Sequence, residues 1–375
     1  MTAQAVARAL ARVSVGAVER NCAHLGSLLT GDAELCAVVK SDGYGHGAVE
    51  CARAAQRGGA TWLAVATAGE AALLRAAGLT GRLLAMGSLT RAETATALAA
   101  DADVAVWEPD FARALAERVG ESGVPARVHV KLDSGMGRLG AIDPAEARAV
   151  AGIAAADPRL ELAGLMTHFA TADEPGDDHF PAQLERFTAF ADELSAAHPG
   201  LIVHAANSAA VYRDPASHFD MARCGVAIYG LDPFQEDPAT HGLEPALALE
   251  VAVGAVRRFE AGWSAGYGQR WTANEPTWVA TLPIGYGDGW RRALTNNCDV
   301  LIGGVRRPLV GTVSMDNVTV DLGAETTVAA GDAAVLIGAQ GGERILAEEV
   351  ARRLGTINYE IACALTARVP RTHEP

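Results

Sequence analysis

The feature that most constrains the fold of this chain is a regular alternation that extends from residue 34 to residue 230. Short apolar runs rich in β-branched residues alternate there with longer segments of helical period, such as Ala68–Ala77 and Ala182–Ala197. Such alternation is typical of repeated strand–helix units whose strands pair in parallel. The expected strands are Leu35–Lys40, Trp62–Thr67, Leu83–Gly87, Val104–Trp107, Ala126–Leu132, Leu162–His168, Ile202–Asn207 and Ala222–Tyr229. Eight parallel strands predict an α/β fold with an N-terminal (β/α)8 barrel of the TIM type.

The sequence changes character after Leu231, where Pro, Gly and Thr become frequent and short alternating runs replace the helical pattern. This change predicts a C-terminal, mainly β domain, and we place the border so that residues 1–240 form the barrel and 241–375 the second domain. One amphipathic helix is expected at Leu346–Leu354, with a continuation at Tyr359–Leu365. The expected strands of this domain are Trp278–Leu282, Val300–Ile302, Val318–Leu322, Ala334–Ile337 and Arg368–Val369.

The charge and cysteine content exclude several classes of function. A formal net charge of -14 and a pI near 5.2 disfavour nucleic acid and anionic membranes as partners. The six cysteines lack the paired spacing of a metal or redox site, so we interpret them as buried free thiols. Arg8 and Arg12 interrupt the N-terminal apolar residues, which makes a poor secretory signal, and no apolar run is long enough to span a bilayer. We therefore expect a cytoplasmic protein without a metal.

The carboxyl ends of barrel strands are where functional side chains are expected. The first expected strand ends in AVVKSDGYGHG, which places Lys40 where desolvation lowers a lysine pKa and makes the amine nucleophilic. By position alone, a surface lysine just past a strand end is the more common case, and only the sequence around Lys40 favours the catalytic interpretation. The fifth strand ends in KLDSGMGRLG, and the cations Lys131 and Arg138 in it pair well only if an anion lies between them.

Further segments complete the pattern: GLMTHFATADEP, HAANSAA, MARCGVAIYG, SAGYGQRW, PIGYGDGW, GTVSMDN and TINYEIACAL. Together with the two lysine segments they resemble, in order and spacing, the motifs of the alanine racemase family, from Lys40 to Arg371. The resemblance implies a pyridoxal-phosphate-dependent isomerase that interconverts L- and D-alanine, works as a homodimer with shared active sites, and supplies D-alanine for peptidoglycan precursors.

The resemblance also implies a role for each matching residue. Lys40 is expected to bind pyridoxal phosphate covalently and to act as one catalytic base, and Tyr267 as the second base, reaching the site from the partner subunit. His168 would tune the tyrosine, and a carbamate on Lys131 would orient Arg138 toward the substrate carboxylate, which Met315 also holds. The remaining cofactor contacts are expected from Tyr44, Asn207, Ser208, Arg223, Gly225, Val226 and Tyr359, and the substrate entrance from Tyr286 and Asp173. His204 could lie near the cofactor or simply pack at its strand end.

Arg223 is the residue that bears most on the type of reaction. By the resemblance, its guanidinium faces the pyridine nitrogen of the cofactor. An arginine cannot accept a proton, so it weakens the ring as an electron acceptor, which favours rapid return of the α-proton. A decarboxylase of basic amino acids shares the architecture, but it places an acid at this position.

The sequence also departs from the family pattern. Ser41 and Gly43 stand where the family often has Ala, and Thr312, Ser314 and Asn317 replace an arginine, a cysteine and a glutamine. These changes put the substrate range in doubt, because serine or a broader set of amino acids could be turned over. A non-catalytic pyridoxal-phosphate-binding protein is a further alternative, which the second domain disfavours.

Overall fold

The computed structural model describes residues 8–119 and 123–375. Residues 1–7, the first part of the N-terminal segment interpreted as a poor secretory signal, lie outside the described residues. The chain divides into two compact units: Val18–Ile228, and Tyr229–Pro375 together with the N-terminal residues up to Ala17. The predicted fold class is confirmed, because the first unit is a parallel eight-stranded barrel and the second is mainly β.

The barrel strands pair in the order β8-β7-β6-β5-β4-β3-β2-β9, and every pair is parallel. At the remaining gap, Asp220 N donates to Val203 O at 3.0 Å and Arg223 N to Ala206 O at 2.9 Å, so the barrel is nearly closed. All eight predicted strands are present, although several end earlier than expected. They are β2 (Glu34–Val38), β3 (Trp62–Val65), β4 (Arg82–Ala85), β5 (Asp103–Val106), β6 (Ala126–Lys131), β7 (Leu160–Met166), β8 (Ile202–His204) and β9 (Met221–Cys224).

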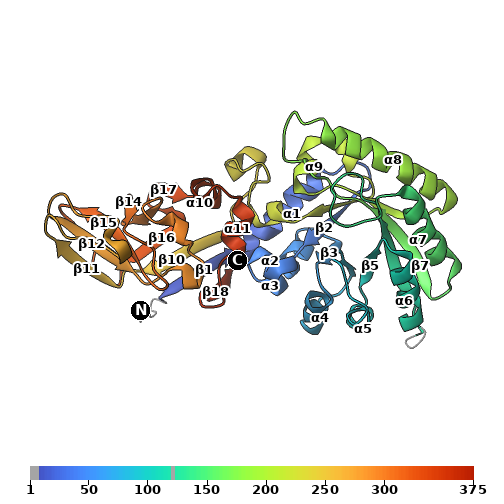
Figure 1. The fold of residues 1–375 in the computed structure, drawn as a ribbon, viewed down its shortest axis with the longest axis horizontal. Coiled ribbons are helices and arrows are strands. Elements are labelled where there is room, and N and C mark those ends of the chain that lie inside the picture. Colours follow the sequence, from blue (N-terminus) through green and yellow to red (C-terminus); the bar gives the residue numbers. More distant parts are fainter. Residues whose placement is uncertain (1–7, 120–122) are drawn as a thin grey trace. The chain divides into compact units, whose positions relative to one another are not determined.

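Helices alternate with these strands, and Figure 1 shows α6, α7 and α8 on the outer side of the parallel sheet. Strands β3 and β5 are buried along their whole length, as expected for a sheet covered on both faces. The helices are α1 (Val15–Leu28), α2 (Lys40–Tyr44), α3 (Ala48–Arg57), α4 (Ala68–Ala76), α5 (Thr94–Ala99), α6 (Pro109–Val119), α7 (Pro144–Ala156), α8 (His179–Ala197) and α9 (Ser208–Arg213), with short 3-10 turns η1 (Pro215–Ser217) and η2 (Val226–Tyr229).

The second unit contains a large sheet in the order β11-β12-β15-β14-β13-β16-β10-β1-β18, with β17 paired to β16. The predicted helix is confirmed as α10 (Ala347–Leu354), which ends at Gly355 in the left-handed conformation, and α11 (Asn358–Cys363) follows. The strands are β1 (Ala9–Ser14), β10 (Leu247–Ala252), β11 (Ala255–Phe259), β12 (Thr277–Leu282), β13 (Asp299–Ile302), β14 (Val305–Val310), β15 (Val318–Gly323), β16 (Ala333–Gln340), β17 (Glu343–Ile345) and β18 (Arg371–Glu374); the 3-10 turns are η3 (Pro238–His241), η4 (Tyr267–Gln269), η5 (Tyr286–Asp288) and η6 (Arg292–Leu294).

Both ends of the chain contribute to this sheet. Strand β1 pairs antiparallel with β10 and parallel with β18, so the first described strand lies between two strands from the C-terminal part. The contacts group β1 and residues 229–240 with the β-rich unit, whereas the sequence placed the border after residue 240. The predicted strand at Arg368–Val369 is wrong, because Val369 N closes a turn onto Thr366 O and Pro370 has no N–H for a ladder.

No helix among the described residues is long and apolar enough to cross a membrane. The six cysteines are all free thiols. Five of them are buried, as predicted, whereas Cys363 is exposed. Within residues 8–119 and 123–375, no three His, Cys, Asp or Glu side chains gather as ligands for a metal ion.

Candidate active site

Lys40 follows strand β2 and begins a strained turn. Ser41, Asp42 and Tyr44 in α2 have φ angles of 53°, 52° and 53°, in the left-handed region. This conformation costs a residue other than glycine about 1–2 kcal/mol, so surrounding contacts must hold it. The Nζ atom of Lys40 lies 6.0 Å from the centroid of the Tyr44 ring. The turn therefore brings a lysine amine and a tyrosine together at the carboxyl end of the barrel.

Two side chains fix this turn to the neighbouring helices. Glu70 accepts a hydrogen bond from Ser41 N at 2.7 Å through Oε1, while its Oε2 caps α4 together with Thr67. Asp42 accepts from Ala48 N at 2.9 Å and so joins the turn to the start of α3. The Lys40 turn is thus tied to two barrel helices, which offsets its backbone strain.

Lys131 is the last residue of β6 and is only 5% exposed. Burial lowers the pKa of its amine to about 8, Arg223 and Arg138 act in the same direction, and Asp133 opposes them. Its Nζ lies 5.8 Å from the centroid of the Trp107 ring. A lysine with this pKa presents a substantial neutral fraction near neutral pH, and the neutral amine is the form that reacts with carbon dioxide.

Asp133 organises the loop that carries Arg138. Its Oδ1 accepts from the N–H groups of Gly135, Met136 and Gly137 at 2.7–3.1 Å, and its Oδ2 accepts from Arg138 N at 2.9 Å. No role was expected for Asp133 from the sequence. The signal was present, because an Asp at a strand end before a Gly-containing segment favours such a side-chain-to-backbone turn.

His168 follows β7 and lies among the cations of the barrel. Burial lowers the pKa of its imidazole well below the ordinary value, and Arg223, Arg138, Lys131 and Lys40 lower it further. Four positively charged side chains therefore act on one histidine. Such a concentration of positive charge in a barrel favours anionic ligands and a neutral His168.

Two hydroxyl groups and two backbone N–H groups lie close together at Gly225. A Cβ atom placed on Gly225 would lie 2.4 Å from the Tyr44 hydroxyl oxygen, so a glycine is required for this close approach. The Ser208 hydroxyl accepts from Gly225 N at 3.1 Å and from Ala227 N at 3.4 Å, and Val226 lies between these two residues. The two hydroxyls and the backbone N–H groups form a cradle suited to a phosphate.

Asn207 and Asp173 occupy different environments in the barrel unit. The Oδ1 atom of Asn207 accepts from Ala210 N at 3.0 Å and caps α9, so its amide nitrogen is the group that could bind an anion. Asp173 is exposed in the segment between β7 and α8. Its predicted place at the entrance stays a prediction.

Arg223 is 4% exposed although it carries a charge. Its Nη1 donates to His204 Nδ1 at 2.8 Å, and its Nη2 donates to Thr167 O and Ala205 O at 2.8 and 3.1 Å. Burial lowers the pKa of this guanidinium to about 10. Of the two readings of His204, the structure shows a buried side chain that contacts Arg223 directly.

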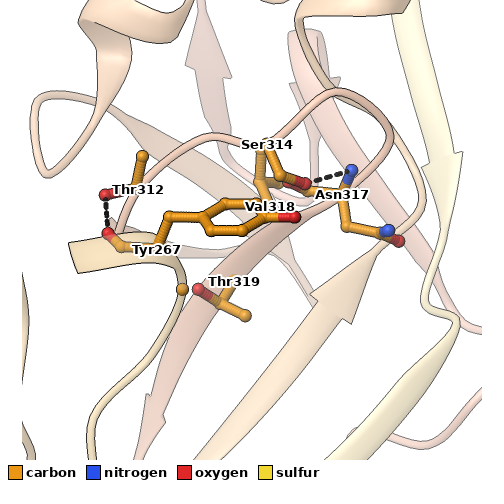
Figure 2. A pocket seen from close by; sticks show the side chains of 7 residues that line it. Tyr267, Thr312, Ser314, Asn317, Val318 and Thr319 are labelled. Atoms are coloured by element: carbon orange, nitrogen blue, oxygen red, sulfur yellow. Dashed lines mark hydrogen bonds between the residues drawn. The ribbon is translucent and has the colours of Figure 1, made fainter. Parts of the chain in front are cut away.

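Tyr267 lies in the β-rich unit and is 74% exposed. Its backbone oxygen accepts a hydrogen bond of 2.6 Å from Thr312 Oγ1, as Figure 2 shows. The Ser314 hydroxyl donates to Asn317 O at 2.8 Å and accepts from Asn317 N at 3.0 Å. The three departures from the family pattern in the β-rich unit, Thr312, Ser314 and Asn317, therefore lie beside this tyrosine. They line a pocket of about 370 Å³ with Gly266, Tyr267, Val318 and Thr319.

The backbone of Tyr267 is held by two close approaches. A Cβ on Gly266 would lie 3.0 Å from Thr312 N, and a Cβ on Gly311 would lie 2.6 Å from Ala265 O. The segments on either side of the pocket thus pack main chain against main chain. Tyr267 is therefore fixed at its backbone while its ring is exposed.

Two other predicted residues of this unit lie on neighbouring loops. Tyr286 is 43% exposed and Met315 is 51% exposed. Tyr286 N donates to Ser314 O at 3.0 Å and Gly287 N to Met315 O at 2.9 Å, so the two loops run together. Tyr359 lies in α11 and is partly buried.

Comparison with known proteins decides the family. The alanine racemase N-terminal domain matches residues 13–233, and the alanine racemase C-terminal domain matches residues 246–373. The chain belongs to the alanine racemase family. Alanine racemase of Symbiobacterium thermophilum is 42% identical over 96% of both chains, and that of Geobacillus stearothermophilus is 39% identical over 96% of this chain and 92% of its own.

Solved structures of alanine racemases have the same fold. The alanine racemase of D-cycloserine-producing Streptomyces lavendulae superposes with a TM-score of 0.94 at 36% identity, over 99% of this chain and 98% of its own. That of Bacillus anthracis, solved with bound L-Ala-P, gives a TM-score of 0.92 at 36% identity, over 100% and 96%. The chain is accordingly an isomerase of this pyridoxal-phosphate-dependent family.

The residues of the barrel unit fit that cofactor. The cradle of hydroxyl and N–H groups at Gly225 matches a phosphate, and Lys40 supplies an amine close to Tyr44. Arg223 offers a buried donor for a ring nitrogen. The positive charge around His168 matches a ligand that carries a phosphate and a carboxylate.

Proposed function

We propose that this chain interconverts L- and D-alanine by a two-base mechanism in which Lys40 and Tyr267 exchange the α-proton. The observation that carries the proposal is the group of cations at His168: Arg223 Nη2 lies 3.4 Å from its Nδ1, and the charges of Arg138 and Lys40 also lower its pKa. A site with this charge suits a small amino acid held by its carboxylate next to a phosphate.

Residues of the barrel would hold the cofactor. Tyr44, Asn207, Ser208 and the N–H groups of Gly225 and Val226 would bind its phosphate. When bound, pyridoxal phosphate withdraws electrons from the α-carbon and so acidifies the α-hydrogen.

Arg223 would donate a hydrogen bond to the ring nitrogen, with Tyr359 as an additional contact from the β-rich unit. Because a guanidinium does not give up its proton, it limits this electron withdrawal, and the α-proton returns quickly. Quick return of the proton suits racemisation, and the acid expected in a decarboxylase of basic amino acids is replaced here by a cation.

Inversion requires that the proton leave one side of the α-carbon and return on the other, so two groups are needed. Lys40 Nζ would serve one side and Tyr267 Oη the other, with His168 tuning the tyrosine. Arg138 would bind the substrate carboxylate as a bidentate donor, oriented by a carbamate on Lys131, and Met315 would contribute its backbone amide.

We also propose that the active unit is a homodimer in which Tyr267 reaches the partner's barrel. The support is the exposure of Tyr267, Met315 and Tyr286 on neighbouring loops, since large side chains exposed together mark interaction surfaces. Mixing Lys40→Ala protein with Tyr267→Phe protein should restore activity in hybrid dimers that carry one intact site. Absence of recovery after subunit exchange would oppose shared sites.

The substrate range is tested by α-proton exchange in deuterated water over a panel of L- and D-amino acids. We expect alanine to exchange fastest, and borohydride treatment of the holoenzyme to fix the cofactor to Lys40. Faster exchange of serine or another amino acid would overturn the choice of alanine. Labelling at a different lysine would overturn the site itself.

We assign the enzyme to the cytoplasm, where it would supply D-alanine for peptidoglycan precursors. The free state of all six cysteines supports a reducing compartment.

A further inference from the structure

A continuous line of hydrogen bonds crosses the interior of the barrel. Asp103 Oδ2 contacts His129 Nε2 at 3.0 Å, His129 Nδ1 contacts His204 Nε2 at 2.8 Å, and His204 Nδ1 contacts Arg223 Nη1 at 2.8 Å. The first three side chains are fully buried, and Arg223 is 4% exposed. The four side chains come from four different strands. Asp103 begins β5, His129 lies in β6, His204 ends β8 and Arg223 lies in β9.

The barrel leaves room for this line. A Cβ on Gly164 would lie 2.5 Å from His129 Nδ1, so only a glycine opposite His129 permits the ring to reach His204. Trp62 packs edge-on against the His129 ring with centroids 5.7 Å apart. His129 is therefore fixed in its place by packing as well as by hydrogen bonds.

The direction of the line follows from its arginine end. A guanidinium has donors and no acceptor, so His204 Nδ1 must accept from Arg223. A neutral His204 then carries its hydrogen on Nε2 and donates to His129 Nδ1. His129 must in turn carry its hydrogen on Nε2 and donate to Asp103. No other arrangement of protons satisfies all three contacts, and burial followed by the charge of Arg223 lowers the pKa of His204 well below its ordinary value.

The far end of the line is a fixed, ionised carboxylate. Burial alone would raise the pKa of Asp103, but hydrogen bonds from His129, Arg82 and Arg127 hold it at about 2. Arg82 Nη2 lies 2.5 Å from Oδ2 and Arg127 Nε lies 2.6 Å from Oδ1. The carboxylate is thus always available as the final acceptor.

Among the residues that the structure describes, the hydrogen-bond acceptors of Arg223 are all uncharged. They are His204, the carbonyl oxygens of Thr167 and Ala205, and more distantly His168 Nδ1 at 3.4 Å. Among the described residues no carboxylate forms an ion pair with it. Asp103 is therefore connected to Arg223 through the imidazoles of His129 and His204.

We infer that Asp103, His129 and His204 form a one-way hydrogen-bond relay that positions Arg223 and aims its remaining N–H groups at the cofactor ring. This inference rests on the proposed function, because the ring nitrogen is the target of Arg223. His204 holds the guanidinium directly, His129 fixes the tautomer of His204, and Asp103 fixes that of His129. These three are positioning residues, and Arg223 is the group that touches the cofactor.

The first test needs no reaction. ¹⁵N-histidine labelling of the wild-type protein, with pyridoxal phosphate bound and after its removal, should show His129 and His204 as neutral Nε2–H tautomers in both states. Observation of His204 as a cation or as the Nδ1–H tautomer would overturn the relay. A protein that shows the expected tautomers but fails to exchange the α-proton of alanine would refute the proposed function and leave the relay intact.

The second test compares His129→Leu with His129→Asn. Both variants lose the contact to Asp103, which keeps its two arginines, but the Asn side-chain oxygen can still accept from His204. We expect His129→Leu to lower kcat on the order of tenfold in both directions, as loss of an outer positioning partner does. The KM and the cofactor affinity should not change. His129→Asn should recover most of kcat and the single His204 tautomer.

The relay would be overturned if both variants lost the same fraction of kcat and if this loss paralleled a fall in their melting temperatures. His129 would then have a purely structural role. If neither variant folds, the wild-type tautomer measurement decides the question alone.

Discussion

Replacement of Gly225 by alanine tests the phosphate cradle most directly. The added Cβ would lie 2.4 Å from the Tyr44 hydroxyl oxygen, so that oxygen must retreat by about 1 Å to reach an ordinary van der Waals separation. Gly225 is not among the residues with positive φ, so the alanine adds a clash without backbone strain. Overpacking of this kind costs about 1–3 kcal/mol. If this cost destabilises the cofactor-bound protein relative to the free protein, the Kd for pyridoxal phosphate rises roughly 5- to 150-fold.

The assay is a titration of the protein with pyridoxal phosphate, followed by absorbance. The matched control is Gly152→Ala, because a Cβ on this exposed glycine of α7 has no neighbour within 4 Å. Its Kd should not change, and the helix should gain about 0.5–1 kcal/mol of stability.

A double-mutant cycle locates the clash. Tyr44→Phe removes the hydroxyl oxygen, and the nearest remaining atom is Cζ, 2.9 Å from the added Cβ. In this background Gly225→Ala should therefore raise the Kd for pyridoxal phosphate less than it does in the protein that retains Tyr44. An unchanged Kd in Gly225→Ala, or an equal rise in both backgrounds, would refute the cradle as described.

Three further predictions concern the bases and the substrate side. Tyr267→Phe should slow α-proton exchange from one enantiomer of alanine far more than from the other, and equal losses in both would contradict a face-specific base. Thr312→Val removes the 2.6 Å hydrogen bond to the Tyr267 backbone, worth about 1 kcal/mol, and should slow the Tyr267-dependent direction, while Thr312→Ser retains it. Because Lys131 is protonated below its pKa of about 8, its carbamate signal in ¹³C-bicarbonate NMR should grow as the pH rises through that value; a signal that persists in Lys131→Gln would belong to another amine.

Much of the barrel could be predicted from the sequence because its strands are buried on both faces and its helices are exposed on one. All eight strands followed from apolar runs separated by helical segments. The strand ends were less accurate: β2 stops at Val38, and Lys40 lies in a left-handed turn rather than at the end of a strand. The apolar run continues past Val38 by one residue, Val39, and the strand was extended with it; the Asp and Gly residues after Lys40 were the signal for a left-handed turn.

The β-rich unit was harder to predict because its pairing is non-local. Strands β1, β10, β11, β14 and β17 were not expected, and the residues of β1 were placed within the barrel range, 1–240. Strand β1 alternates between buried and partly exposed residues, a signal that fits a sheet with one covered face. Its partners, β10 and β18, lie far along the sequence, so the signal did not show where the strand belongs.

The residues of the candidate site were predicted from strand ends and family motifs. Neither of these indicates which other side chains hold the site residues in place by hydrogen bonds. The cluster of cations around His168 could be expected from parallel strand ends, because those ends meet at one rim. The relay from Asp103 could not, since Asp103 begins β5 and His129 lies within β6, where sequence patterns indicate only packing. Hydrogen bonds between side chains inside a barrel depend on the register of neighbouring strands, and sequence motifs do not indicate that register.

The position of β1 between β10 and β18 has a consequence for synthesis on the ribosome. The first strand leaves the exit tunnel early, but its antiparallel partner begins at Leu247 and its parallel partner at Arg371. At a translation rate of about 5–20 residues per second, β1 waits on the order of 10–50 s for its first partner. The barrel can fold within that interval, whereas the sheet that carries Tyr267 is completed only when nearly the whole chain has been released.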